Sequence, residues 1–109
     1  MLFLYFYLMR DAPDRVGAVA PQHAAYWRDL RLTDYLGGPF ADRMGGLITF
    51  ESGSVAEAEQ LVAADPFVVE DLLDRRWLRE WTIDEERRDE PIARAPGSRR
   101  PVDPVRTRA

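Results

Sequence analysis

The segment Leu2–Met9 (LFLYFYLM) constrains the fold of this chain most strongly, because it contains only apolar and aromatic residues. Its length and its aromatic content are typical of a β-strand rather than of a helix. A strand with one face in water alternates polar and apolar residues, and this segment does not alternate. It therefore predicts a central strand that is covered on both faces.

The same segment is only about half as long as a helix that spans a membrane. It also lacks the basic start and the small-residue cleavage site of a signal peptide. We therefore expect no membrane segment, no targeting segment and a cytoplasmic location.

A helix is predicted to begin at Pro21, since proline suits the first turn of a helix. The residues that follow at spacings of three and four form one helical stripe: His23, Tyr26, Trp27, Leu30 and Asp34. Gly37-Gly38-Pro39 is predicted to end the helix or strand that precedes it. A short strand fits residues 32–36.

The second half of the chain begins with a predicted strand over residues 45–51 (GGLITFE), which are rich in strand-favouring types. Ser54 followed by Glu57 is a capping box that starts a helix. Pro66 disfavours helical geometry at the preceding residue, so this helix should end near Asp65. A helical turn through residues 67–73 and a last strand over residues 75–83 complete the pattern.

The order of these elements is that of the ferredoxin-like β-α-β-β-α-β arrangement, an α+β fold. Two helices would cover one face of a four-stranded antiparallel sheet. The apolar first strand also needs cover on its other face, which a second copy could provide. We therefore expect a domain over residues 1–84 that pairs through its sheet as a homodimer.

Residues 85–109 are rich in Arg and Pro and poor in large apolar residues. Such a segment cannot bury enough surface to offset the entropy of ordering it. We therefore predict a disordered C-terminal tail, which is solvated or, alternatively, contacts an acidic partner.

Composition excludes several kinds of functional site. The chain has no Cys, which rules out disulfides, thiol nucleophiles and thiolate metal sites. It has one His, and all 15 of its basic residues are Arg, so His-rich metal sites and Lys Schiff-base chemistry are excluded. The net charge of −4 argues against nucleic-acid binding.

His23 is the candidate for acid–base chemistry, because its imidazole is the only side chain here that ordinarily titrates near neutral pH. Asp65 is the preferred orienting partner, since the start of one helix and the end of an antiparallel neighbour can lie close together. Asp11 and Asp14 are rivals for this role. Alternatively, His23 packs among aromatic residues as a structural group, and Asp65-Pro66 only starts a turn.

Over residues 1–84 the sequence resembles the YCII-related domain family of the dimeric α+β barrel superfamily. The resemblance rests on the aromatic first strand with its Arg/Asp-containing loop, on APQHAAYWRDL, on Gly38-Pro39-Phe40 and on GGLITFESGSVAEAEQLVAADPF. The family pairs a His of the first helix with the Asp of a D-P-F motif, which implies His23 and Asp65 here. Ala20 departs from the pattern, because many members have an Arg three residues before the His.

The resemblance implies an enzyme without metal or cofactor that isomerises, or eliminates a group from, a small cyclic or aromatic substrate. Characterised members include a dehydrochlorinase of a chlorinated aromatic, and muconolactone isomerases share the barrel. His23 would move a proton, Asp65 would hold its tautomer, and Arg10 would anchor an acidic group. The expected pocket lining is Tyr7, Phe40, Phe67 and Trp77.

Other readings remain open from the sequence. Trp77 shares a strand face with Trp81 and could instead belong to a dimer core. The chain could be a non-catalytic module that binds a small ligand or associates with a partner. A haem-type or cofactor-free monooxygenase is a third alternative, since the superfamily contains both.

Overall fold

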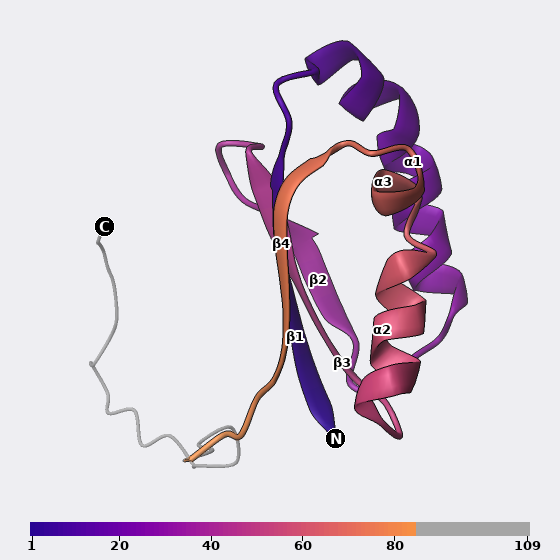
Figure 1. The fold of residues 1–109 in the computed structure, drawn as a ribbon, viewed down its shortest axis with the longest axis vertical. Helices are drawn as coiled ribbons and strands as arrows, with labels where there is room; N and C mark the ends of the chain where they lie inside the picture. The colour runs from indigo at the N-terminus through magenta and orange to yellow at the C-terminus, as the bar shows by residue number, and fades with distance from the viewer. Residues whose placement is uncertain (85–109) are drawn as a thin grey trace, which may run out of the picture.

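The computed structural model describes residues 1–84, and the predicted tail at residues 85–109 lies outside them. Figure 1 shows one sheet with all the helices of this part on the same side. The four strands are antiparallel in the order β2-β3-β1-β4. The elements are β1 (Leu2–Met9), α1 (Pro13–Asp29), β2 (Leu36–Pro39), β3 (Gly45–Glu51), α2 (Val55–Ala63), α3 (Pro66–Val69) and β4 (Leu73–Glu80). The predicted α+β fold class with its four-stranded antiparallel sheet is therefore confirmed.

β1 lies in the middle of the sheet, between β3 and β4, as its apolar sequence predicts. Alternate residues Phe3, Tyr5 and Tyr7 face the helices and are almost fully buried. Leu4 and Phe6 face the opposite side and are only partly buried. Residues 1–84 thus cover one face of β1 with helices and leave the other without a second layer (Figure 1).

α1 begins two turns earlier than predicted, at Pro13 instead of Pro21. Both prolines suit a first turn, but Val16, Val19 and Ala20 pack against the core and extend the helix toward Pro13. Pro21 lies inside the helix. A proline there removes one backbone hydrogen bond. Among residues 1–84, no helix is long and apolar enough to cross a membrane.

β2 was predicted at residues 32–36 and forms at Leu36–Pro39 instead. Its pairing with β3 places Leu36 opposite Thr49 and Pro39 opposite Gly46. Tertiary pairing therefore overrides the weak strand preference of Gly37-Gly38-Pro39. The segment tolerates Pro39 because β2 is an edge strand of the sheet.

α2 has the predicted N-terminus, since the Ser54 hydroxyl accepts a hydrogen bond from the backbone N–H of Glu57 at 3.1 Å. The Glu57 carboxylate reaches back to the N–H of Gly53 at 2.8 Å. The first bond satisfies a donor that the first turn leaves free, and the second fixes the chain just before the helix. The helix ends at Ala63, just before Asp65, and α3 follows directly.

Candidate functional site

Asp65 lies at the junction between α2 and α3, where it caps the N-terminus of α3. Its Oδ1 accepts the backbone N–H of Phe67 at 2.9 Å. The D-P sequence favours this local structure, because Pro66 needs no partner at the first position of the helix. The side chain of Asp65 is 0% exposed. A buried carboxylate must have its oxygens paired, so its other contacts decide whether this site is stable.

Three side chains complete the environment of the Asp65 carboxylate. Oδ2 accepts hydrogen bonds from the Tyr5 hydroxyl at 3.0 Å and from Trp27 Nε1 at 3.1 Å. Oδ1 lies 2.8 Å from His23 Nδ1. The Trp27 indole and the Phe67 amide can only donate, which holds the carboxylate in the role of an acceptor.

His23 comes from α1 and extends toward the sheet with 13% of its side chain exposed. Since Asp65 acts as an acceptor, His23 Nδ1 carries the proton that it donates to Oδ1. The other ring nitrogen, Nε2, is then free to accept, and it lies 3.3 Å from the Tyr7 hydroxyl. The Phe67 ring stacks on the imidazole with centroids 4.2 Å apart and planes 21° apart. The imidazole is therefore fixed in both position and tautomer.

Tyr7 approaches His23 from β1. Burial, followed by the negative charge of Asp65, raises the pKa of the Tyr7 phenol above its ordinary value, so the hydroxyl keeps its proton at neutral pH. The strand partner of Tyr7 is Gly46. A Cβ at Gly46 would overlap the Tyr7 hydroxyl, so the absence of a side chain there makes room for it.

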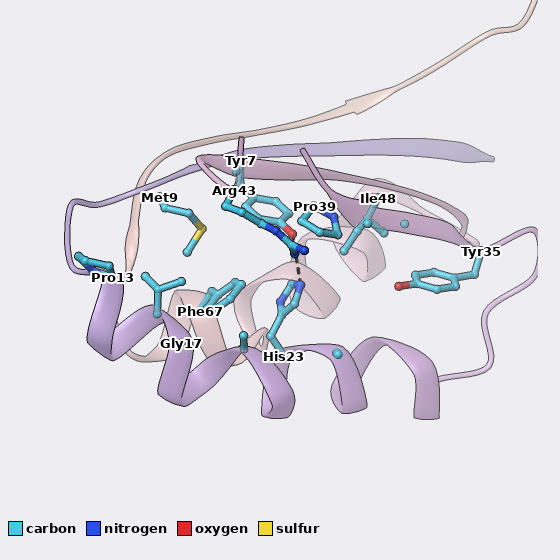
Figure 2. Close-up of a pocket in the computed structure, with 16 residues that line it drawn as sticks. Tyr7, Met9, Pro13, Gly17, His23, Tyr35, Pro39, Arg43, Ile48 and Phe67 are labelled. Carbon is cyan, nitrogen blue, oxygen red and sulfur yellow. Dashed lines mark hydrogen bonds between the residues drawn. The ribbon is translucent and has the colours of Figure 1, made fainter. Parts of the chain in front are cut away.

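A cavity of about 590 Å³ adjoins these groups, between α1 and the sheet (Figure 2). Its volume lies within the range of roughly 300–1,000 Å³ that is typical of small-molecule sites. Its lining is mainly apolar or glycine, including Met9, Val16 and Ile48. The polar side chains that reach it are Tyr7, His23, Tyr35 and Arg43.

The structure brings together four of the seven residues that the sequence analysis nominated. His23 contacts Asp65 and Tyr7 directly, and Phe67 stacks on its ring. Tyr7, His23 and Phe67 line the cavity, while Asp65 supports His23 from behind. The rivals Asp11 and Asp14 make no hydrogen bond to His23 in the described residues.

The other three nominated residues do not line this cavity, and the expected lining is corrected accordingly. Phe40 and Trp77 lie against Phe6 on the opposite face of the sheet, with centroids 5.4 and 5.0 Å from its ring. The strand register puts Trp77 beside Phe6 and so fixes this face. Arg10 is at the surface, where it pairs with Asp71 at 3.1 Å.

Sequence reasoning missed Tyr5, Trp27 and Arg43. Trp27 was placed on the same helical stripe as His23 but was given no role at the site, and Tyr5 lies two residues before Tyr7 on the same strand face, so spacing could have added it. Arg43 comes from the turn between β2 and β3, and nothing in the local sequence distinguishes it from other Arg residues. Within residues 1–84 no three His, Asp or Glu side chains gather as a metal site would require.

Comparison with known proteins gives the following matches. A family model described as YCII-related domain matches residues 1–82. The 5-chloro-2-hydroxyhydroquinone dehydrochlorinase TftG from Burkholderia phenoliruptrix AC1100, in complex with 2,5-dihydroxybenzoquinone, superposes with a TM-score of 0.65 at 24% identity, covering 75% of this chain and 94% of that one. Rv0793 from Mycobacterium tuberculosis superposes with a TM-score of 0.51 at 17% identity, covering 77% and 95%. A comparison with curated proteins finds no match. These two structural matches show a shared α+β fold.

Proposed function

The chain belongs to the YCII-related domain family, and on that premise we propose that it is a small-molecule enzyme of the lyase or isomerase type. His23 is the acid–base group, Asp65 is its positioning residue, and the substrate is a small cyclic or aromatic compound. The reaction needs no cofactor, because proton transfer by an imidazole is sufficient for isomerisation or for elimination. The observation that carries this proposal is the Asp65–His23–Tyr7 chain of contacts at the wall of a cavity.

The first step assigned to His23 is removal of a substrate proton by Nε2. This nitrogen faces away from Asp65 and has a lone pair, because the Nδ1 proton is engaged at 2.8 Å. A proton taken up at Nε2 makes the ring an imidazolium, which the adjacent carboxylate stabilises. The same proton can return to another atom of the substrate in an isomerisation. In an elimination it stays on His23 while the leaving group departs with the bonding electron pair.

Tyr7 supports this chemistry from the opposite side of Nε2. Its hydroxyl keeps its proton and lies 3.3 Å from Nε2 when no substrate is bound. A substrate oxygen that enters the cavity offers Tyr7 a stronger acceptor. We propose that Tyr7 then donates to that oxygen, where negative charge develops after proton removal.

The substrate class is suggested by TftG, which is a dehydrochlorinase of 5-chloro-2-hydroxyhydroquinone. We carry over from this likeness only a small, hydroxylated six-membered ring. Such a ring fits the volume of the cavity and could lie against the apolar lining that Met9, Val16 and Ile48 provide.

The test is turnover of 5-chloro-2-hydroxyhydroquinone, followed by chloride release, together with exchange of substrate protons in heavy water. His23→Ala should lower the rate by roughly 10²–10⁴-fold while the protein stays folded by circular dichroism. Asp71→Asn, which changes a surface carboxylate, should leave the rate unchanged. Retained turnover in His23→Ala ends the proposal. Binding without turnover or exchange in the wild type would instead make the chain a binding module.

We further propose that a second copy of the chain covers the helix-free face of the sheet. This outer face carries Leu4, Phe6, Leu47 and Trp77, which the strand registers place next to one another. Leu36, at its edge, is 74% exposed. An apolar sheet face of this kind is stabilised by packing against another sheet, and a homodimer would supply it.

A further inference from the structure

Arg43 is the cationic side chain that lines the cavity among the described residues. It lies in the turn between β2 and β3, held by a hydrogen bond from its own N–H to the Phe40 carbonyl at 2.9 Å. Figure 2 shows its side chain extending from the sheet side of the cavity toward His23, which comes from α1. A permanent positive charge thus lies over an otherwise mainly apolar hollow.

Within residues 1–84, the Arg43 guanidinium has no acidic partner. Three other Arg residues of this part pair with a carboxylate: Arg10 with Asp71 at 3.1 Å, Arg15 with Glu70 at 3.8 Å and Arg28 with Asp29 at 3.1 Å. The Asp65 carboxylate, which is the buried negative charge nearest the cavity, is already engaged by its four donors. The guanidinium therefore offers unused donors to whatever occupies the cavity.

The backbone at Arg43 is in the left-handed region, with φ at 65°. Glycine or asparagine adopts this conformation more easily than arginine does. Arg31 has a similar φ of 51° but is not among the cavity residues. Substituting Arg43 and Arg31 in turn therefore separates the effect of losing an Arg in this backbone conformation from the effect of losing a guanidinium at the cavity.

We propose that Arg43 is a specificity-determining residue that binds an anionic oxygen of the substrate, on a ring carboxylate or a phenolate. The inference rests on the proposed function and deepens it, since it names the charge of the substrate. With the anion on Arg43, the ring lies over the apolar lining and its reacting carbon is turned toward His23 Nε2. An anion is preferred over a neutral analogue because the guanidinium attracts it, and since Arg43 is exposed, added salt should weaken this preference.

The test measures binding without turnover, by isothermal titration calorimetry of two matched ligand pairs. Benzoate against benzamide reports on a carboxylate, and 4-nitrophenolate against 4-nitroanisole, above the phenol's pKa, reports on a phenolate. The proteins are the wild type, Arg43→Gln, Arg43→Lys and Arg31→Gln. Circular dichroism checks that each variant is folded.

The wild type should bind at least one anion about tenfold or more tightly than its neutral counterpart, a preference worth about 1.4 kcal/mol. Arg43→Gln should lower that preference to within about twofold, Arg43→Lys should keep part of it, and Arg31→Gln should leave it unchanged. The pair that shows the preference identifies the anion as carboxylate or phenolate. The inference is overturned if the wild type binds neither anion preferentially, if Arg43→Gln keeps the preference, or if Arg31→Gln loses it equally.

This result is separable from the proposed function, because the preference is measured in the absence of any reaction. An Arg43-dependent preference in a protein whose turnover survives His23→Ala would leave the anion site standing and remove the acid–base role. Loss of turnover in His23→Ala with no anion preference would do the reverse.

Discussion

The two faces of β1 are built from alternate residues of one segment, and they differ in burial and in polar contacts. On the inner face, Tyr5 and Tyr7 are buried under the helices and their hydroxyls reach Asp65 and His23. On the outer face, Leu4 and Phe6 are partly buried and carry no polar group at all. The sequence segment looks uniform, yet only its inner face brings hydroxyl groups to Asp65 and His23.

The difference teaches that the polar atoms of the aromatic residues mark the face of β1 that adjoins the candidate site. Tyr and Trp fill a core as Phe does, and each also needs a hydrogen-bond partner when it is buried. On the inner face these partners converge on Asp65. On the outer face Leu4 and Phe6 have no polar side-chain atom and make no such demand, whereas Trp77 beside Phe6 still carries an indole N–H.

The largest expected loss of stability comes from replacing Asp65, the carboxylate on which the hydrogen bonds of the inner face converge. Asp65→Asn keeps the shape of the side chain but turns an amide N–H₂ toward a group of donors. The free energy of unfolding should fall by about 3 kcal/mol or more in urea titrations. Asp71→Asn, at an exposed carboxylate paired with Arg10, should lower it by less than about 1 kcal/mol. Equal losses in the two variants would mean that the inner network does not stabilise the fold.

The variant Phe6→Arg tests the outer face, because it places a charge where sheet-to-sheet packing is proposed. The dimer dissociation constant should rise roughly 100-fold or more in sedimentation equilibrium, because an apolar anchor is lost and a charge is buried. Val69→Arg, at a residue of α3 that is 65% exposed, is the matched control and should leave association unchanged. A monomeric wild type, or a Phe6→Arg variant that associates as tightly, would refute the proposed homodimer.

Two Gly→Ala substitutions, each adding one methyl group, compare how tightly the sheet is packed at Gly46 and at Gly38. Gly46→Ala forces the Tyr7 hydroxyl aside and crowds the Gly38 carbonyl oxygen, which would lie 2.9 Å from the new Cβ. It should destabilise the protein by about 1–3 kcal/mol. Gly38→Ala meets no atom within 4 Å and should change stability by less than about 1 kcal/mol. The assay is thermal unfolding, and a larger loss for Gly38→Ala would contradict the packing described here.

Alkaline pH gives the smallest effect, and it acts through Tyr5 and Tyr7 of the inner face and also through Tyr26 and Tyr35, since burial raises the pKa of all four phenols. Burial, followed by the charge of Asp65, raises the pKa of both Tyr5 and Tyr7 in the folded state. The unfolded chain therefore loses these protons first, binds fewer protons than the folded chain, and stability falls as pH rises above about 10. The chain has no Lys, so no amine side chain titrates in the same window.

From pH 10 to 11 each of these tyrosines should remove about 1 kcal/mol from the free energy of unfolding. Tyr5→Phe should lose correspondingly less over this interval, as measured by urea titrations at both pH values. An identical pH slope in Tyr5→Phe and the wild type would show that Tyr5 is not protected in the fold.

Much of the local structure could be predicted because its signals act between near neighbours. The Ser54 capping box and the apolar β1 were each interpreted correctly from a few residues. The start of α1 was wrong, since two prolines fit the same rule and only packing against the core selects Pro13. The edge strand β2 was misplaced because its residues gain strand structure from β3 rather than from their own preferences.

The candidate site also has a part that the sequence predicted and a part that it did not. The residue types alone selected His23 as the single imidazole of the chain, and the D-P-F motif of the family that the sequence resembles pointed to Asp65. The sequence could not measure the distances that separate His23 from Asp65, Asp11 and Asp14, or tell which face Phe40 and Trp77 would occupy. A shift of one residue in strand register moves a side chain to the other face, so this assignment needs the pairing itself.

The sequence by itself determined a chain with a single His as its acid–base candidate, no thiol or Lys-amine chemistry, and an apolar strand in the middle of the sheet. Only the tertiary structure decided which groups meet. His23 and Asp65 are 42 residues apart, Tyr5 and Asp65 are 60 apart, and Arg43 reaches the cavity while Arg10 does not. The physical reason is that composition and local pattern act within a turn or a strand, whereas a buried carboxylate is satisfied only when separate elements pack together and bring their donors to it.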